Sequence, residues 1–171
     1  MKQPILLKTI LDICFILLAL TFFGAVVIFI LALIMSPDFY PIEVNDRILS
    51  EFTPVTIILV TSELAIGGLV LYTVYVLRKL VRSFFKGKLY TRFQIAALHL
   101  VGQLIVIITL AQAFTDSTGK MLIEAKADIA VGINFSFGSF WFVLAIGLFF
   151  MYLSKIFRSA KILKEENELT V

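Results

Sequence analysis

An uncharged apolar segment near the amino end is the strongest constraint on the fold of this chain. It runs from Ile13 to Met35, and its 23 residues form a helix of roughly 34 Å, enough to cross the hydrocarbon core of a membrane. Lys2 and Lys8 precede it, as they would in a cleaved signal peptide. The segment is longer than a signal-peptide core, however, and no small-residue cleavage site follows before Ser36. The sequence therefore predicts a retained membrane anchor.

Three more apolar segments follow the first, and the composition agrees with membrane insertion. Of the 171 residues, 60% are hydrophobic and only 16% are charged, which places the chain well outside soluble domains. We therefore predict an all-α membrane protein of one domain with four transmembrane helices. The predicted spans are residues 13–35, 55–77, 93–114 and 135–153; the outer loops are 36–53 and 115–134, the connector is 78–92 and the tail is 154–171.

Lys and Arg are concentrated on one side of the predicted spans. The amino end, the connector and the tail hold two, six and four of them, twelve of the fifteen in the chain. Because Lys and Arg beside a span resist translocation, both termini are expected in the cytoplasm. The same cations favour contact with the head groups of anionic membrane lipids, whereas no motif supports direct binding of nucleic acid. The connector cations are Arg78, Lys79, Arg82, Lys86, Lys88 and Arg92.

The outer loops carry a second kind of pattern. Residues Asp116 to Lys120 form a cluster typical of turns, and apolar and polar residues alternate from Ile123 to Ile133. A period of two indicates a half-buried strand, and Ile42 and Val44 repeat it more briefly in the first outer loop. We expect the two outer loops to meet in a small extracytoplasmic β-element. A helical or disordered loop is the alternative.

The connector ends in a defined helix start. Gly87 suits the left-handed position that closes a helix, and Thr91 with Gln94 forms a T-x-x-Q capping box. The turn between the second and third spans is therefore expected to be tight.

Glu63 is the one acidic or basic residue inside the second span. It follows Pro54 by nine residues, which places it roughly 13 Å from the outer end of its helix. A charged carboxylate at such a depth costs about 2.5–3.5 kcal/mol, so it is expected to face protein or water. Two interpretations stay open: a proton or ligand site, and a carboxyl group that holds helices together.

His99 and Gln103 lie one helical turn apart on the third span. Gln103 is expected near the depth of Glu63, where it would bond to that side chain from a neighbouring helix. Hydrogen bonds between helices are favoured over a metal site, because a lone His lacks further ligands at metal spacing. No catalytic pair or phosphate-binding motif occurs, so neither enzymatic activity nor a cofactor is expected. Gly67 and Gly68 are expected to permit close approach of helices.

Two short segments resemble a bacterial membrane-protein family catalogued as domain of unknown function 2975. The first is FFKGKLYTRFQIAALHLVG, residues 84–102, which begins in the connector and continues into the third span. The second is the ending IFRSAKILKEENELTV, residues 156–171. The matching positions are Gly87, Tyr90 and Thr91 before the third span, and Glu165 to Val171 at the end. The chain departs from the family pattern at Gln94, where Asn is usual, and at His99, where Arg is more typical.

The resemblance implies four spans, no established activity, and a frequent genomic neighbour that encodes a small helix-turn-helix regulator. We therefore expect a regulatory or sensory component of the bacterial cytoplasmic membrane. Its contacts with lipid or a cytoplasmic partner would come from the connector cations and from Glu165, Glu166 and Asn167. The alternative is a small proton-coupled transporter, or a resistance or immunity protein, that uses Glu63; a homo-oligomer would be able to assemble its path.

Overall fold

A computed structural model describes the backbone of residues 5–35, 42–44, 47–49, 54–85, 90–124 and 139–169, and side chains within most of these ranges. Four long helices account for nearly all of the described chain. All four are long and apolar enough to cross a membrane, which confirms the predicted number of spans. The helices are α1 (Ile5–Met35), α2 (Pro54–Phe84), α3 (Arg92–Glu124) and α4 (Phe140–Leu169).

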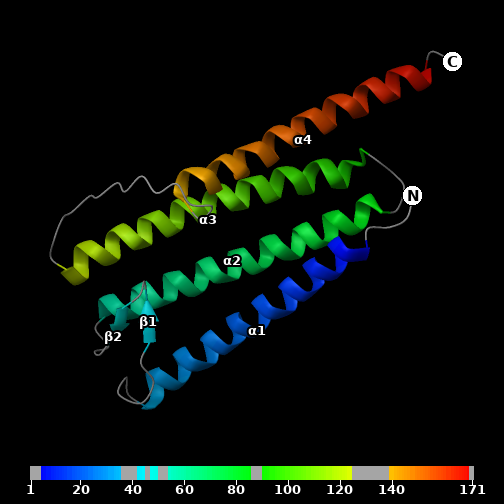
Figure 1. The fold of residues 1–171 in the computed structure, drawn as a ribbon. Coiled ribbons are helices and arrows are strands. Elements are labelled where there is room, and N and C mark those ends of the chain that lie inside the picture. Colours follow the sequence, from blue (N-terminus) through cyan, green and yellow to red (C-terminus); the bar gives the residue numbers. More distant parts are fainter. Residues whose placement is uncertain are drawn as a thin grey trace.

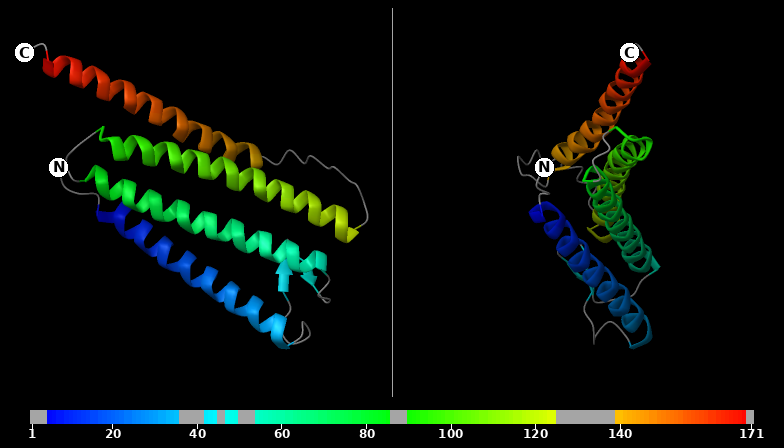
Figure 2. Two further views of the ribbon diagram at one scale, coloured as in Figure 1. Left: turned by 180° about the vertical axis from the view of Figure 1, so that it is seen from behind. Right: turned by 90° about the vertical axis from the view of Figure 1, so that its right-hand side faces the viewer.

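The helices lie side by side in chain order, with α1 at one edge of the row and α4 at the other (Figure 1). Figure 2 shows the same order from behind. Successive helices run in opposite directions, so the start of α1, the end of α2, the start of α3 and the end of α4 lie together (Figure 1). We call this the basic end, because it carries Arg78, Arg82, Arg92 and Lys155; the other is the opposite end.

The buried core lies toward the basic end, between α2, α3 and α4. Its buried residues are Val76, Leu80, Ala97, Leu98 and Val101, and its partly buried neighbours are Leu77, Phe84, Leu100, Ile105, Phe150, Leu153 and Phe157. α1 packs chiefly against α2 and adds little to this core. Ala32 is the only buried hydrophobic residue among the described side chains of α1.

Two glycines bring α3 and α4 into contact. A Cβ atom on Gly102 would lie 2.6 Å from the carbonyl oxygen of Gly147 and 2.8 Å from the backbone nitrogen of Met151. Since both obstacles are backbone atoms, only glycine fits at this crossing, as is common where membrane helices pack closely. Gly67 and Gly68 differ: they face the ring of Phe22 on α1, and a Cβ there would lie at ordinary contact distances of 3.4–3.8 Å.

The helix start predicted after the connector is confirmed. The Thr91 hydroxyl accepts a hydrogen bond from the Gln94 backbone N–H at 3.2 Å, and Gln94 Oε1 accepts one from the Thr91 N–H at 3.1 Å. Both N–H groups would otherwise lack a partner in the first turn of α3. Tyr90 just before it adopts the left-handed backbone conformation, with φ of 61°. The turn expected at Gly87 lies outside the described residues.

The prediction for the second outer loop is wrong where the structure describes it. The cluster from Asp116 to Lys120 is helical, and α3 continues through Ile123 to Glu124, where a strand was expected to begin. Each residue of a helix makes its own local hydrogen bonds, and this outweighs the short alternating pattern. The rest of that pattern, residues 125–133, lies outside the described residues.

The β-element expected from both outer loops is therefore not supported. What the structure describes instead is a hairpin within the first loop alone, β1 (Ile42–Val44) paired antiparallel with β2 (Arg47–Leu49). In its register Ile42 pairs with Leu49 and Val44 with Arg47.

Candidate functional site

At the basic end, three aromatic rings connect α4 to the connector between α2 and α3. The ring of Phe157 on α4 lies 6.0 Å from that of Phe84 and 5.3 Å from that of Tyr90, both edge-on. We call Phe84, Tyr90 and Phe157 the aromatic joint. Edge-to-face pairs of this kind contribute about 0.5–1.5 kcal/mol beyond their buried area. The two segments that carry the family resemblance thus contact each other.

A hydrogen bond fastens α4 next to the aromatic joint. The Ser154 hydroxyl donates to the backbone carbonyl of Ile95 at 2.8 Å, and Ser154 is buried. Bonds of this type between membrane helices contribute about 0.6 kcal/mol on average. Beyond Phe157 most of α4 is exposed, and its end extends past the other helices (Figure 1).

The acidic ending lies on this exposed part of α4. Glu165, Glu166 and Asn167 are all exposed. Glu165 pairs with Lys161 at 3.4 Å, and Glu168 pairs with Lys164 at 3.7 Å, one turn apart along the helix. Such pairs support the helix by a few tenths of a kcal/mol, roughly 0.3–0.5 each. The charges proposed as partner contacts therefore also keep the end of α4 helical.

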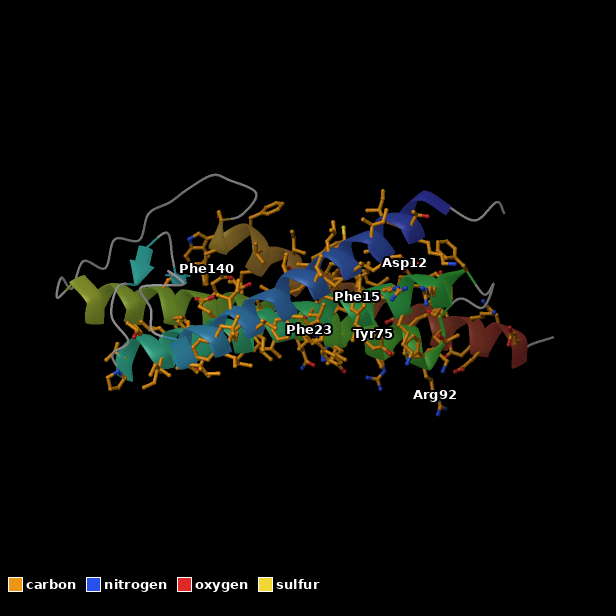
Figure 3. All side chains as sticks on the ribbon, turned by 90° about the horizontal axis from the view of Figure 1, so that it is seen from below. Asp12, Phe15, Phe23, Tyr75, Arg92 and Phe140 are labelled. Atoms are coloured by element: carbon orange, nitrogen blue, oxygen red, sulfur yellow. The ribbon has the colours of Figure 1, made fainter. Side chains whose placement is uncertain are left out.

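An ion cluster that sequence analysis missed holds α1 to α2 at the basic end. Asp12 accepts hydrogen bonds from the guanidinium groups of both Arg78 and Arg82, the latter at 3.2 Å. The Arg78 guanidinium also lies 5.2 Å from the centre of the Phe15 ring, which in turn packs against Tyr75. Figure 3 shows Asp12, Phe15 and Tyr75 gathered toward this end. We call Asp12, Arg78 and Arg82 the ion clasp.

The ion clasp changes the interpretation of the connector cations. Arg78 and Arg82 were expected to contact lipid or a partner, but the structure pairs both with Asp12. Lys79 lies over the Phe93 ring at 5.6 Å, and Arg92 is exposed. Lys86 and Lys88 lie outside the described residues. The signal that would have revealed Asp12 is its position: a carboxylate directly before an uncharged span, on the side where arginines gather.

Glu63 meets a second carboxyl group rather than Gln103. Asp116 on α3 lies within electrostatic range of Glu63. Oε1 of Glu63 and Oδ1 of Asp116 are both buried, and neither has a hydrogen-bond partner in the described part of the chain. Buried carboxyl oxygens without a donor are costly, and two carboxylates so placed repel one another.

His99 and Gln103 do not join this pair. Gln103 is exposed on α3 and His99 is half-buried, and neither makes a side-chain hydrogen bond within the described ranges. Gln103 was expected at the depth of Glu63 because the third span was expected to end at residue 114. α3 continues to Glu124 instead, so Asp116 and not Gln103 lies near Glu63. Across the described residues no group of three or more His, Cys, Asp or Glu is placed to hold a metal ion.

Comparison with known proteins identifies a family but no activity. A family profile with the description "Protein of unknown function (DUF2975)" matches residues 40–171, from the first loop to the last residue. The match omits α1. No curated protein and no solved structure shows significant similarity to the chain.

Proposed function

Because the chain belongs to the DUF2975 family, whose function is unknown, we propose its role from the geometry of the basic end. It is a regulatory or sensory component of the bacterial cytoplasmic membrane, with both termini in the cytoplasm, that acts through a cytoplasmic partner. The partner proposed is a small helix-turn-helix regulator, bound by protein contacts and not through DNA. The role requires no catalytic group and no cofactor.

The aromatic joint is the observation that supports this proposal. α4 is one uninterrupted helix from Phe140 to Leu169, so a tilt or shift of its membrane segment moves its exposed end as a rigid rod. Phe157 ties that rod to the turn between α2 and α3 through Phe84 and Tyr90. A change in the packing of any of these three helices therefore changes how the exposed end is presented. That is the mechanical requirement for a membrane sensor.

The exposed end also has suitable chemistry for a protein contact. Glu165, Glu166 and Glu168 offer carboxylates beyond the bundle, next to exposed Ile162 and Leu163. A surface that combines apolar side chains with a charged rim is typical of protein interfaces. The cations Lys155 and Arg158 lie closer to the membrane, where anionic head groups attract them.

Photo-crosslinking in the source organism tests the proposal. A photoreactive amino acid at Glu168 of the full chain should form a covalent adduct with a DNA-binding regulator, identified by mass spectrometry. The same amino acid at Ser117, which is exposed near the opposite end, is the matched control and should not. Adducts with a regulator from both positions, or with membrane proteins alone from Glu168, would contradict the proposal.

A second variant pair tests the role of the aromatic joint. Phe157→Ala removes the ring that contacts Phe84 and Tyr90, whereas Phe149→Ala removes an exposed ring from the same helix. If α4 transmits a change in packing, Phe157→Ala should lower the adduct yield at Glu168 at least fivefold, and Phe149→Ala should leave this yield unchanged. Equal yields in both variants would show that the joint has no part in presenting the tail.

The carboxyl pair favours one alternative, a small proton-coupled transporter or a resistance or immunity protein. Glu63 and Asp116 are two buried, unpartnered carboxyl oxygens on neighbouring helices, which is an arrangement able to take up and release a proton. Proteoliposomes that contain a pH-sensitive dye measure this directly. Under this alternative the chain accelerates proton entry, Glu63→Gln and Asp116→Asn each abolish the acceleration, and Gln103→Ala retains it. No acceleration by the native chain would exclude proton conduction, although not proton-independent resistance.

A further inference from the structure

The side chain of Gln103 faces the membrane without a partner in its own chain. The sequence favoured hydrogen bonds from this residue to another helix, but across the described ranges its side chain makes none. Gln103 is exposed on α3, whereas Val101, Gly102 and Leu104 around it are buried. α3 therefore turns this amide away from its packed side. The row of helices is one helix thick (Figure 2), so the exposed side of α3 meets lipid.

Gln103 lies deep in the hydrocarbon. The Ser154 hydroxyl donates to the Ile95 carbonyl, so Lys155, next to Ser154, is near the level of Ile95. Lys155 is exposed, and an exposed cation marks the cytoplasmic boundary of the hydrocarbon. Gln103 follows Ile95 by eight residues, roughly 12 Å along α3. Since the hydrocarbon is roughly 30 Å thick, this short side chain reaches neither head groups nor water.

Two exposed threonines show how a polar side chain is usually satisfied in such a position. The hydroxyl of Thr21 donates to the carbonyl of Leu17, and that of Thr61 donates to the carbonyl of Ile57, each one turn earlier in its own helix. An unpaired amide in hydrocarbon is costly, because no water replaces its missing hydrogen bonds. Since the described chain gives Gln103 no such bond, its partner comes from another molecule.

We propose that this partner is Gln103 of a second copy of the chain, with the two α3 helices side by side at a two-fold axis along the membrane normal. A primary amide complements itself, because the carbonyl oxygen of each side chain accepts from the NH₂ group of the other. Two copies inserted in one orientation carry Gln103 at the same depth, so a second copy supplies the required group at the required level. A different protein would have to bring a matching polar group to that depth independently.

The surroundings of Gln103 allow this contact. Ala96, two turns earlier on the same side, is exposed and small, which lets two helices approach closely. Ile107, one turn later, is 52% exposed and apolar. Arg92 precedes Ile95 by three residues, on the cytoplasmic side of the boundary, where water and salt screen the repulsion between two copies. The interface is independent of the proposed regulatory role, because it needs no cytoplasmic partner.

Single-molecule photobleaching of the purified, labelled chain in liposomes tests the pairing, because no other protein is present. The native chain should bleach mostly in two steps at high dilution in lipid. Gln103→Leu should raise the dissociation constant of the dimer about tenfold, the factor expected for hydrogen bonds between membrane helices. Gln103→Asn keeps the amide and should retain more of the dimer than Gln103→Leu. Since Gln103 bonds to nothing in its own chain, these changes affect association and not the folding of one copy.

Gln112→Leu is the matched control for the photobleaching. Gln112 is also exposed, but it lies nine residues after Gln103, on the opposite side of α3 and nearer the outer boundary of the hydrocarbon. This change should leave the dissociation constant as it is in the native chain. One-step bleaching of the native chain at every dilution would contradict a dimer. A dissociation constant unchanged in Gln103→Leu, or raised equally in Gln112→Leu, would show that another surface forms the dimer.

Cysteine crosslinking of the full chain in liposomes locates the interface independently. The native Cys14, exposed on α1, is replaced by Ser before single cysteines are introduced. With an oxidant, Ala96→Cys and Ile107→Cys, which retain Gln103, should give disulfide-linked dimers. Gln112→Cys, on the opposite side of α3, should remain largely monomeric. Equal dimer yields at residues 107 and 112 would overturn the proposal.

Discussion

At the scale of single residues, the packing of α3 rests on two polar or small side chains that hydropathy does not distinguish. Gln94 is fully buried, with 0% exposure, and its side chain caps the helix to which it belongs. Gly102 lies where the backbones of α3 and α4 touch. Both residues lie in residues 84–102, one of the two segments that carry the family resemblance.

Gln94→Ala should destabilise the protein by about 1 kcal/mol or more, because the Thr91 N–H loses its acceptor at the start of α3. Gln103→Ala makes the same chemical change at an exposed position of the same helix and should alter stability by less than about 0.5 kcal/mol. Thermal unfolding in detergent, followed by circular dichroism, measures both. Equal losses in the two variants would mean that the capping box does not contribute.

Gly102→Ala should destabilise the contact between α3 and α4 by about 1–3 kcal/mol. The added methyl group meets the Gly147 carbonyl oxygen at 2.6 Å, and neither backbone can move away without losing helix hydrogen bonds. Gly24→Ala is the control, since a Cβ at that position has no atom within 4 Å. The same unfolding assay should place Gly24→Ala at or slightly above the native stability, because Ala favours a helix more than Gly does. If Gly102→Ala were as stable as the native chain, α3 and α4 would lie further apart than the structure places them.

At the scale of elements, α1 differs from the other three helices. It lies at the edge of the row, outside the residues matched by the family, and away from the shared core. Its attachments to α2 include the ion clasp, the contact of Phe15 with Tyr75, and Phe22 over the two glycines. An element with little part in the buried core is expected to loosen before the core does.

Asp12→Asn should loosen α1 from α2 at the basic end, because the amide no longer balances the charges of Arg78 and Arg82. Spin labels at the native Cys14 and at Tyr72→Cys, which is an exposed position on α2, report the distance between the helices. The distance distribution should broaden in Asp12→Asn and stay narrow in Lys8→Gln, a neutralised charge one turn earlier on α1. A narrow distribution in both variants would show that apolar contacts alone position α1.

At the scale of the whole molecule, the even number of helices and the collection of cations at one end predict the topology. A fluorescent protein that folds only in the cytoplasm should be bright when fused after Val171, and alkaline phosphatase fused there should be inactive. A fusion of the phosphatase in the loop between α1 and α2 should be active. Active phosphatase at Val171 would place the basic end outside and would exclude a cytoplasmic partner for the tail.

Much of this architecture follows from local properties of the sequence. Length and hydropathy predict each membrane helix, because every backbone hydrogen bond in the bilayer must be made within the helix itself. The capping box is equally local, since Thr91 and Gln94 are three residues apart. The alternation after Ile123 is a local pattern too, but α3 extends into it as far as Glu124. A short alternating segment forms a stable strand only when further strands or a helix pack against it, and this depends on the rest of the fold.

The contacts between helices depended on the tertiary structure, because hydropathy specifies that a segment enters the membrane but not which of its faces meets which neighbour. Asp12 finds Arg78 and Arg82 only because α1 and α2 lie side by side, and Glu63 meets Asp116 only because α3 is long enough to reach its depth. The sequence by itself determined four apolar helices and one cationic end, through the cost of placing charge in hydrocarbon. The row order, the ion clasp, the carboxyl pair and the aromatic joint were decided by packing between residues far apart in the chain.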